Sequence, residues 1–225
     1  MTEVGRSIFS QSYVALTQLH VCFNIDTAAE FGMELAIDSL LALTIYTTEQ
    51  SNITTRGKIK GWRFKRLRDF EIRNMRMTRD VSMFIAEHGQ TIRSLSFDTI
   101  LIGCGFHYAI EKCAILDSLT ISFRHPNLIT FHQQCLKMFV IQDLEQFDVT
   151  SARHREYLMR LLECSTDDES NFLPSLQVVV LQGLKPSILT ENEMYNEGKH
   201  ILDNVIRNCE LRDIRVCTDM GFMVG

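Results

Sequence analysis

Several features that would place the chain in a membrane or outside the cell are missing from its 225 residues. No apolar run approaches the roughly 18 residues that a membrane-spanning helix needs. The first residues, Met1–Arg6, lack the charged and then apolar segment of a secretory signal. The seven cysteines are odd in number and include no C-x-x-C pair, which is typical of buried, reduced thiols. We therefore expect an intracellular protein, cytoplasmic or nuclear, without membrane contact.

Motifs that carry catalysis or bind metals are also missing. The sequence has no G-x-S-x-G, no Walker loop and no G-x-G-x-x-G. Its seven histidines are scattered, without the His-x-x-x-His or Cys-His spacing that holds a metal ion. These absences predict a protein that is not an enzyme and that uses no cofactor and no metal.

What the sequence does contain is a short apolar pattern that recurs along the chain. In both Ile92–Phe97 and Leu116–Ile121, apolar residues occupy positions 1, 4 and 6, and the two copies lie 24 residues apart. The offsets between successive copies are 24, 27, 25, 24, 20, 40 and 35 residues, and the first five fall within the period of leucine-rich repeats. The eight copies are Leu16/Leu19/Val21, Leu40/Leu43/Ile45, Leu67/Phe70/Ile72, Ile92/Leu95/Phe97, Leu116/Leu119/Ile121, Leu136/Phe139/Ile141, Leu176/Val179/Leu181 and Leu211/Ile214/Val216.

This pattern has a physical explanation in a stack of short strands. Each strand points its side chains at positions 1, 4 and 6 inward, and one unit alone cannot bury them, so neighbouring units must stack to form a core. The pattern predicts an α/β fold over residues 1–225, a single leucine-rich repeat solenoid of about eight irregular repeats. A curved parallel sheet is expected on its concave side, with helices and loops on its convex side.

The segments between the copies show helical periodicity in several places. Thr78 is a candidate N-cap for a helix whose apolar stripe contains Val81, Phe84 and Ile85. Comparable stripes are Ala28/Phe31/Leu35, Phe106/Ile110/Cys113, a stripe within Ser151–Cys164, and Ile201/Leu202/Val205/Ile206/Cys209 within Gly198–Cys209. Two connections differ: Thr47–Trp62 is predicted to be a basic loop, and residues 165–175 an acidic loop insertion.

One stretch resembles a known family. Residues Leu67–Thr78, Phe84–His88 and Thr91–Phe97 are similar to a strand, turn, helix and strand in the leucine-rich repeat region of fungal F-box proteins. The resemblance implies a protein–protein recognition module of the kind that holds substrates for a ubiquitin ligase. The 15 residues ahead of Leu16 are too few for an F-box, so we expect the F-box or N-terminal cap to be missing here. A ubiquitin-ligase adaptor is then an expected partner only if an F-box is supplied elsewhere.

The candidate binding surface is the concave face, formed by positions 3 and 5 of each repeat. Position 5 carries His20, Thr44, Glu71, Ser96, Thr120, Val140, Val180 and Arg215. Position 3 carries Gln18, Ala42, Asp69, Ser94, Ser118, Met138, Val178 and Asp213. Both columns change from polar to apolar along the array, and an exposed apolar patch often marks an interface. The residues predicted to bind a protein ligand are Glu71, Ser96, Thr120, Met138, Val140, Val178, Val180 and Arg215. The alternative is that the acidic insertion or the C-terminal segment covers the apolar part.

A second candidate surface is basic. Between Arg56 and Arg79 ten cationic residues face only two acidic ones, a local charge of +8 in a chain whose net charge is −5. Such a segment is able to bind nucleic acid or an acidic partner through the patch Lys58, Lys60, Arg63, Lys65, Arg66 and Arg68. Trp62 and Phe64 interleave this patch, but no nucleic-acid motif is present. A solvated loop beside an acidic body is the favoured interpretation.

Overall fold

The computed structural model describes residues 16–23, 34–47, 59, 61–75, 77–98, 105–123, 131–146, 151, 152, 154, 156, 173–184 and 196–218. Within these residues the chain forms eight strands, three α-helices and one 3₁₀ turn. They are β1 (Gln18–Phe23), β2 (Ala42–Thr47), β3 (Asp69–Arg73), α2 (Arg79–His88), β4 (Ser94–Phe97), α3 (Phe106–Lys112), β5 (Ser118–Ser122), β6 (Met138–Gln142), η1 (Leu144–Gln146), β7 (Val178–Leu181), α6 (Asn196–Leu211) and β8 (Arg215–Thr218).

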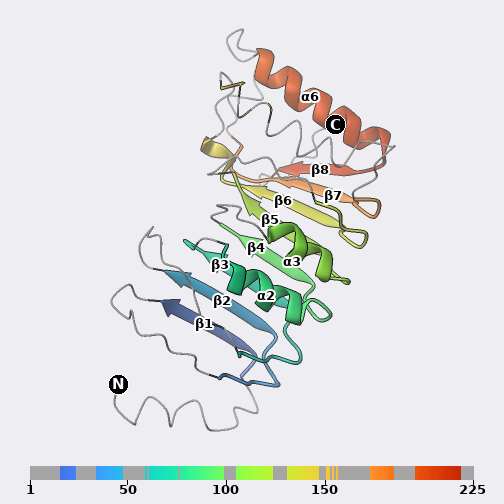
Figure 1. The fold of residues 1–225 in the computed structure, drawn as a ribbon. Helices are drawn as coiled ribbons and strands as arrows, with labels where there is room; N and C mark the ends of the chain where they lie inside the picture. Colours follow the sequence, from blue (N-terminus) through green and yellow to red (C-terminus); the bar gives the residue numbers. More distant parts are fainter. Residues whose placement is uncertain are drawn as a thin grey trace.

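All eight strands lie side by side in one parallel sheet, in the order in which they occur along the chain (Figure 1). The register aligns equivalent positions of successive repeats, so that Leu43 pairs with Phe70 and Phe70 with Leu95. This row continues through Leu119 and Phe139 to Val179. The predicted α/β class and solenoid-like stack of parallel strands are therefore confirmed.

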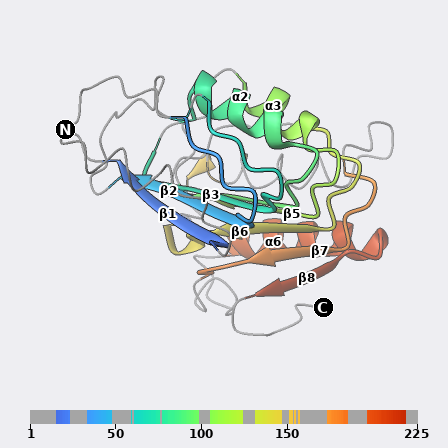
Figure 2. The ribbon, with the colours of Figure 1, turned by 90° about the horizontal axis from the view of Figure 1, so that it is seen from below.

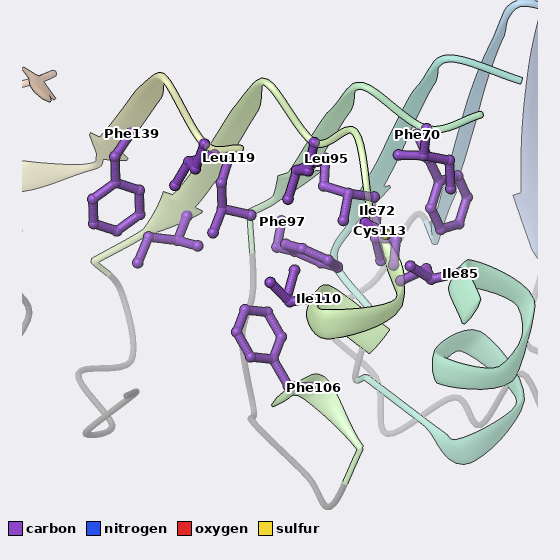
Figure 3. Packing of buried hydrophobic residues seen from close by; sticks show 14 of the residues in the cluster. Phe70, Ile72, Ile85, Leu95, Phe97, Phe106, Ile110, Cys113, Leu119 and Phe139 are labelled. Atoms are coloured by element: carbon purple, nitrogen blue, oxygen red, sulfur yellow. The ribbon is translucent and has the colours of Figure 1, made fainter. Parts of the chain in front are cut away.

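The apolar positions of the repeats form one continuous core. At positions 4 and 6 of β2 to β7, every side chain is at most 2% exposed. Figure 3 shows Phe97 of β4 pointing toward Ile110 and Phe106 of α3, and the rings of Phe97 and Phe106 lie 5.5 Å apart between centroids. Burying one such side chain stabilises the fold by roughly 1.5–3 kcal/mol, so the rows between sheet and helices dominate the folding free energy.

Helices α2 and α3 cover one face of the sheet, and a polar side chain caps the start of α2. Figure 2 shows α2 and α3 together on the same side of the strands. The hydroxyl of Thr78 accepts a hydrogen bond from the Val81 N–H, which confirms the predicted N-cap. In α6 the side chains of Leu202, Val205, Ile206 and Cys209 are buried, which confirms the predicted stripe for these four residues, and the side chain of Ile201 lies outside the described part.

Backbone hydrogen bonds at position 2 join each repeat to the next. The Arg68 carbonyl accepts hydrogen bonds from the N–H groups of both Arg93 and Ser94, at 2.8 and 3.0 Å. The same two-donor arrangement recurs at Thr17, Leu41, Arg93, Asp117 and Lys137. These backbone bonds do not depend on the side chain, which is why residues as different as leucine, arginine and aspartate occupy the position.

Polar groups also join successive repeats at or just beyond the C-terminal ends of β2, β3 and β4. Thr47 donates its hydroxyl hydrogen bond to the Asn74 carbonyl at 2.8 Å. The Asn74 N–H in turn donates to Asp98 Oδ1 at 2.7 Å, and Asn74 has a φ of 54°. Asparagine is among the residues that tolerate this left-handed conformation best. Thr47, Asn74 and Asp98 thus bridge three repeats although they do not form a regular asparagine ladder.

The eighth repeat departs from the sequence prediction in its register. Val178 pairs with Arg215 and Val179 with Val216, so Val216 occupies position 4 and Thr218 position 6. Helix α6 extends to Leu211, whose side chain is 79% exposed instead of buried at position 1. Leu211, Ile214 and Val216 have the spacing of the repeat pattern. Leu211, however, lies at the end of α6, outside the buried stripe of that helix.

Several predicted segments lie wholly or mainly outside the described residues. They include most of the basic loop Thr47–Trp62, most of the helix within Ser151–Cys164, and residues 165–172 of the acidic insertion 165–175. Of the first predicted helix only Leu35 is described, and it is buried and not helical.

Candidate partner-binding face

The face of the sheet opposite α2 and α3, here called the open face, displays the side chains at positions 3 and 5. The strand register places five of the predicted binding residues in one row across β3 to β7. In order along this row they are Glu71, Ser96, Thr120, Val140 and Val180. A second row, at position 3, contains the predicted residues Met138 and Val178. The register thus brings these residues together as predicted, and their binding of a partner stays a prediction.

The β3 part of the open face is occupied by a charged hydrogen-bond network. Glu71 accepts a hydrogen bond from the Thr44 hydroxyl at 3.0 Å and two from Arg73, at 2.7 and 2.9 Å. These bonds to Glu71 raise the pKa of Arg73 above its ordinary value. Glu71 is thus already satisfied within the protein, and a partner would meet a neutralised pair at this point.

The middle of the open face is a strip of short hydroxyl side chains, here called the hydroxyl strip. It consists of Ser94 and Ser96 on β4, paired with Ser118 and Thr120 on β5. All four are of intermediate exposure. Short side chains leave the backbone of a sheet accessible to a close contact, and their hydroxyls are able both to donate and to accept hydrogen bonds.

Apolar residues on β6 and β7 form the adjoining part of the open face, here called the apolar patch. Met138 is 39% exposed, and Val178 and Val180 are of intermediate exposure. Val140, in contrast, is only 6% exposed although it belongs to the same surface. Met138 is therefore the most accessible apolar anchor, and Val140 contributes chiefly to stability.

Arg215 lies elsewhere in the pattern than the sequence predicted. The register opposite Val178 puts it at position 3, in line with Met138 and Val178, and Cys217 takes position 5 beside Val180. The Arg215 N–H donates to the Gln177 carbonyl, as the position 3 N–H of Val178 does to Lys137. Asp213, predicted at position 3, instead lies in the turn after α6 with a φ of 58°.

A charged row at position 2, beside the open face, was missed by sequence reasoning. Asp117 accepts hydrogen bonds from Arg93 at 2.9 Å and from Lys137 at 3.1 Å. The bond from Lys137, together with that from Arg93, holds the pKa of Asp117 below its ordinary value. The signal was present as alternating charge at equivalent positions of three repeats, but only the structure shows that they are neighbours.

The basic segment is partly neutralised within the protein. Arg63 forms an ion pair with Glu87 at 3.0 Å, and Lys65 forms one with Asp38 at 2.8 Å. Arg66 and Arg68 are exposed, whereas Lys58 and Lys60 lie outside the described residues. The chain's own acidic groups thus engage part of the predicted patch.

The aromatic residues of this segment are not available for stacking on bases. Trp62 is 4% exposed and Phe64 is 2% exposed, and both belong to the core. Their rings pack edge to face at 6.0 Å between centroids, and Trp62 also stacks on Phe23. Trp62 and Phe64 therefore have a structural role in the core and are not placed to contact nucleic acid.

The part of the chain that the structure describes contains neither a metal-binding cluster nor a helix that could span a membrane. No three histidine, cysteine, aspartate or glutamate side chains there lie close enough together to hold a metal ion. No described helix combines the length and the apolar character needed to cross a bilayer. A shallow open depression of about 420 Å³ lies beside Gly61 and Arg63, lined also by Glu34, Leu35 and Ala36.

Comparison with known proteins adds no identification. No protein-family model, no curated protein and no solved structure matches this chain. The open face therefore has to be interpreted from its own geometry and chemistry.

Proposed function

We propose that this chain is a leucine-rich repeat recognition module, similar to the substrate-binding repeats of F-box proteins, that holds a protein ligand on its open face without catalysing a reaction. The observation that carries the proposal is the unbroken register of eight parallel strands, which places the side chains at positions 3 and 5 in two rows on the face opposite α2 and α3. Recruitment to a ubiquitin ligase would additionally require an F-box and an adaptor.

The composition of the open face supports protein binding. Of the large hydrophobic side chains that are exposed in the described residues, Met138 is the one on this face, and it adjoins the half-buried Val178 and Val180. Methionine adapts its flexible side chain to different partners. The hydroxyl strip beside it supplies hydrogen-bonding groups without bulk. An apolar centre bordered by polar groups is the usual anatomy of a protein interface.

The proposal is tested by replacing Met138→Glu and measuring, by quantitative mass spectrometry, which proteins the chain captures from a fungal lysate. A carboxylate at this position would have to be desolvated against an apolar partner surface, so capture should fall at least tenfold. Val140→Asp is a poor test because Val140 is buried and its replacement would destabilise the fold.

Met83→Glu is the matched control. Met83 is 43% exposed and lies on α2, on the side of the sheet away from the open face, so the chemical change and exposure are nearly the same. Capture by this variant should equal that of the wild type. If both variants capture the same proteins as the wild type, the open face is not the binding surface and the proposed function is wrong.

A further inference from the structure

The corrected register of β8 creates a composite surface that the sequence pattern did not reveal. Met138, Val178 and Arg215 pair in sequence across β6, β7 and β8, all at position 3. Adjacent strands are separated by about 4.8 Å, so Met138 and Arg215 lie roughly 10 Å apart with Val178 between them. An exposed cation thus borders the apolar patch on the side opposite the hydroxyl strip.

The charge of Arg215 is available to a partner. Its side chain is exposed, and within the described part of the chain it makes no ion pair or side-chain hydrogen bond. The two cations nearest the apolar patch at position 2 differ, because Arg93 and Lys137 share Asp117. Of the described charged residues that border the apolar patch, Arg215 is therefore the cation without an internal counterion.

We infer that the open face takes a partner segment in which apolar side chains are followed, roughly 10 Å away, by a carboxylate. This inference rests on the proposed function and specifies its ligand. The apolar side chains would contact Met138, Val178 and Val180, and the carboxylate would accept hydrogen bonds from the Arg215 guanidinium, whose planar fork matches a carboxylate.

The net charge of the chain makes this inference specific. At −5 the protein repels acidic peptides at long range, so non-specific electrostatics would select basic ligands. Enrichment of acidic ligands would have to come from a local cation. The composition of selected ligands therefore separates a site at Arg215 from general charge attraction.

The first experiment selects random short peptides displayed on phage against the full chain. The wild type should enrich peptides that combine leucine, phenylalanine or methionine with aspartate or glutamate. Arg215→Glu should lose these peptides and shift toward lysine and arginine. Arg207→Glu is the matched control, because Arg207 is exposed on α6 and the substitution changes the net charge equally. This variant should retain the wild-type selection.

The second experiment measures the affinity of one selected peptide. Arg215→Gln should weaken binding about fivefold, the range expected for a partly exposed ion pair, and raised salt should weaken the wild type similarly. Cys217 and Cys22 provide an internal footprint, since both lie on the open face, at β8 and β1. Bound peptide should slow iodoacetamide alkylation of Cys217 and leave Cys22 unchanged.

Separate outcomes overturn the two proposals. If selected peptides depend on Met138 but contain no acidic residue, or bind Arg215→Glu as well as the wild type, the inference about the carboxylate fails while the proposed function stands. Equal rates of Cys217 alkylation with and without saturating peptide would also contradict the inference. If Met138→Glu selects the same peptides as the wild type, the open face is not the binding site and both fail.

Discussion

At the scale of single residues, His88 joins helix α2 to the preceding repeat. It is 7% exposed, its Nε2 accepts a hydrogen bond from the Phe64 N–H at 3.1 Å, and its Nδ1 donates to the Phe84 carbonyl at 2.9 Å. Both ring nitrogens are thus used by the neutral imidazole, and a proton on Nε2 would face another N–H. Burial lowers the pKa of His88 below its ordinary value of about 6.5.

This environment predicts a pH-dependent contribution to stability. Because the folded pKa is depressed, the unfolded chain binds the proton first, and the stabilisation present above about pH 6.5 is lost as pH falls toward the folded pKa. The His88→Ala variant should be less stable at neutral pH by roughly 1–3 kcal/mol, since the Phe64 N–H loses its acceptor. Urea unfolding at neutral and mildly acidic pH tests this, with His107→Ala, an exposed site on α3, as the control.

Gly89, the residue after His88, allows two repeats to approach closely. A Cβ at this position would lie 2.3 Å from the Lys112 carbonyl oxygen at the end of α3. Its φ of −59° is ordinary, so proximity alone makes glycine necessary. Gly89→Ala should therefore destabilise the protein by about 1–3 kcal/mol through overpacking.

Whether Gly89→Ala lowers or raises the free energy of unfolding shows whether the close contact with Lys112 exists. Without the contact to Lys112, replacing glycine by alanine would stabilise the chain by about 0.4–1 kcal/mol through the unfolded state. Urea denaturation distinguishes the two signs, and Gln90→Ala, at the exposed neighbouring position, should change little. A more stable Gly89→Ala protein would show that α2 and α3 are farther apart than described.

At the scale of elements, the strands were predictable and the end of the array was not. Six strand cores follow from apolar residues that are locally spaced and deeply buried, as in Leu95/Phe97 and Leu119/Ile121. The eighth repeat failed because Leu211 completes the apolar triplet while the helical stripe of α6 excludes it. The spacing of three apolar residues alone does not reveal that the preceding helix continues through the first of them. Gln133, which donates to the Ile110 and Cys113 carbonyls at the end of α3, also carries no recognisable signal.

The boundary between α6 and β8 gives a direct test. Leu211→Ala should change the free energy of unfolding by less than about 0.5 kcal/mol, because the side chain is already 79% exposed. Leu116→Ala, at the true position 1 of its repeat and 0% exposed, should cost about 2–5 kcal/mol. If the two variants lost similar amounts of unfolding free energy, Leu211 would be buried at position 1 and the register predicted from the sequence would be correct.

At the scale of the whole molecule, the candidate site was predictable as a surface but not as a set of accessible groups. Alternation along each strand places Glu71, Ser96 and Thr120 on one face, whichever repeat is considered. Their availability depends on neighbours contributed by other repeats, such as Arg73 bound to Glu71 and the packing that leaves Val140 6% exposed. Such contacts arise only when the strands are assembled.

The distribution of charge predicts weak interaction with nucleic acid. Arg63 and Lys65 are paired internally, and Trp62 and Phe64 are buried. We expect a filter-binding titration with mixed-sequence RNA at low salt to show no retention above that of a charge-matched acidic protein. Retention that weakens steeply with salt would instead assign a binding role to the basic segment.

The position 2 joints also bear on how the array can grow. The backbone part of each joint consists of one carbonyl and two N–H groups, so the strand after Arg93 meets its predecessor through the same bonds as the strand after Asp117 does. A tandem copy of one repeat would find the same backbone hydrogen bonds on either flank, and it would need a glycine where Gly89 lets the end of the next helix approach. Whole repeats can therefore be gained or lost in evolution while the sheet stays intact. The length of the open face can change in this way independently of the residues that line it.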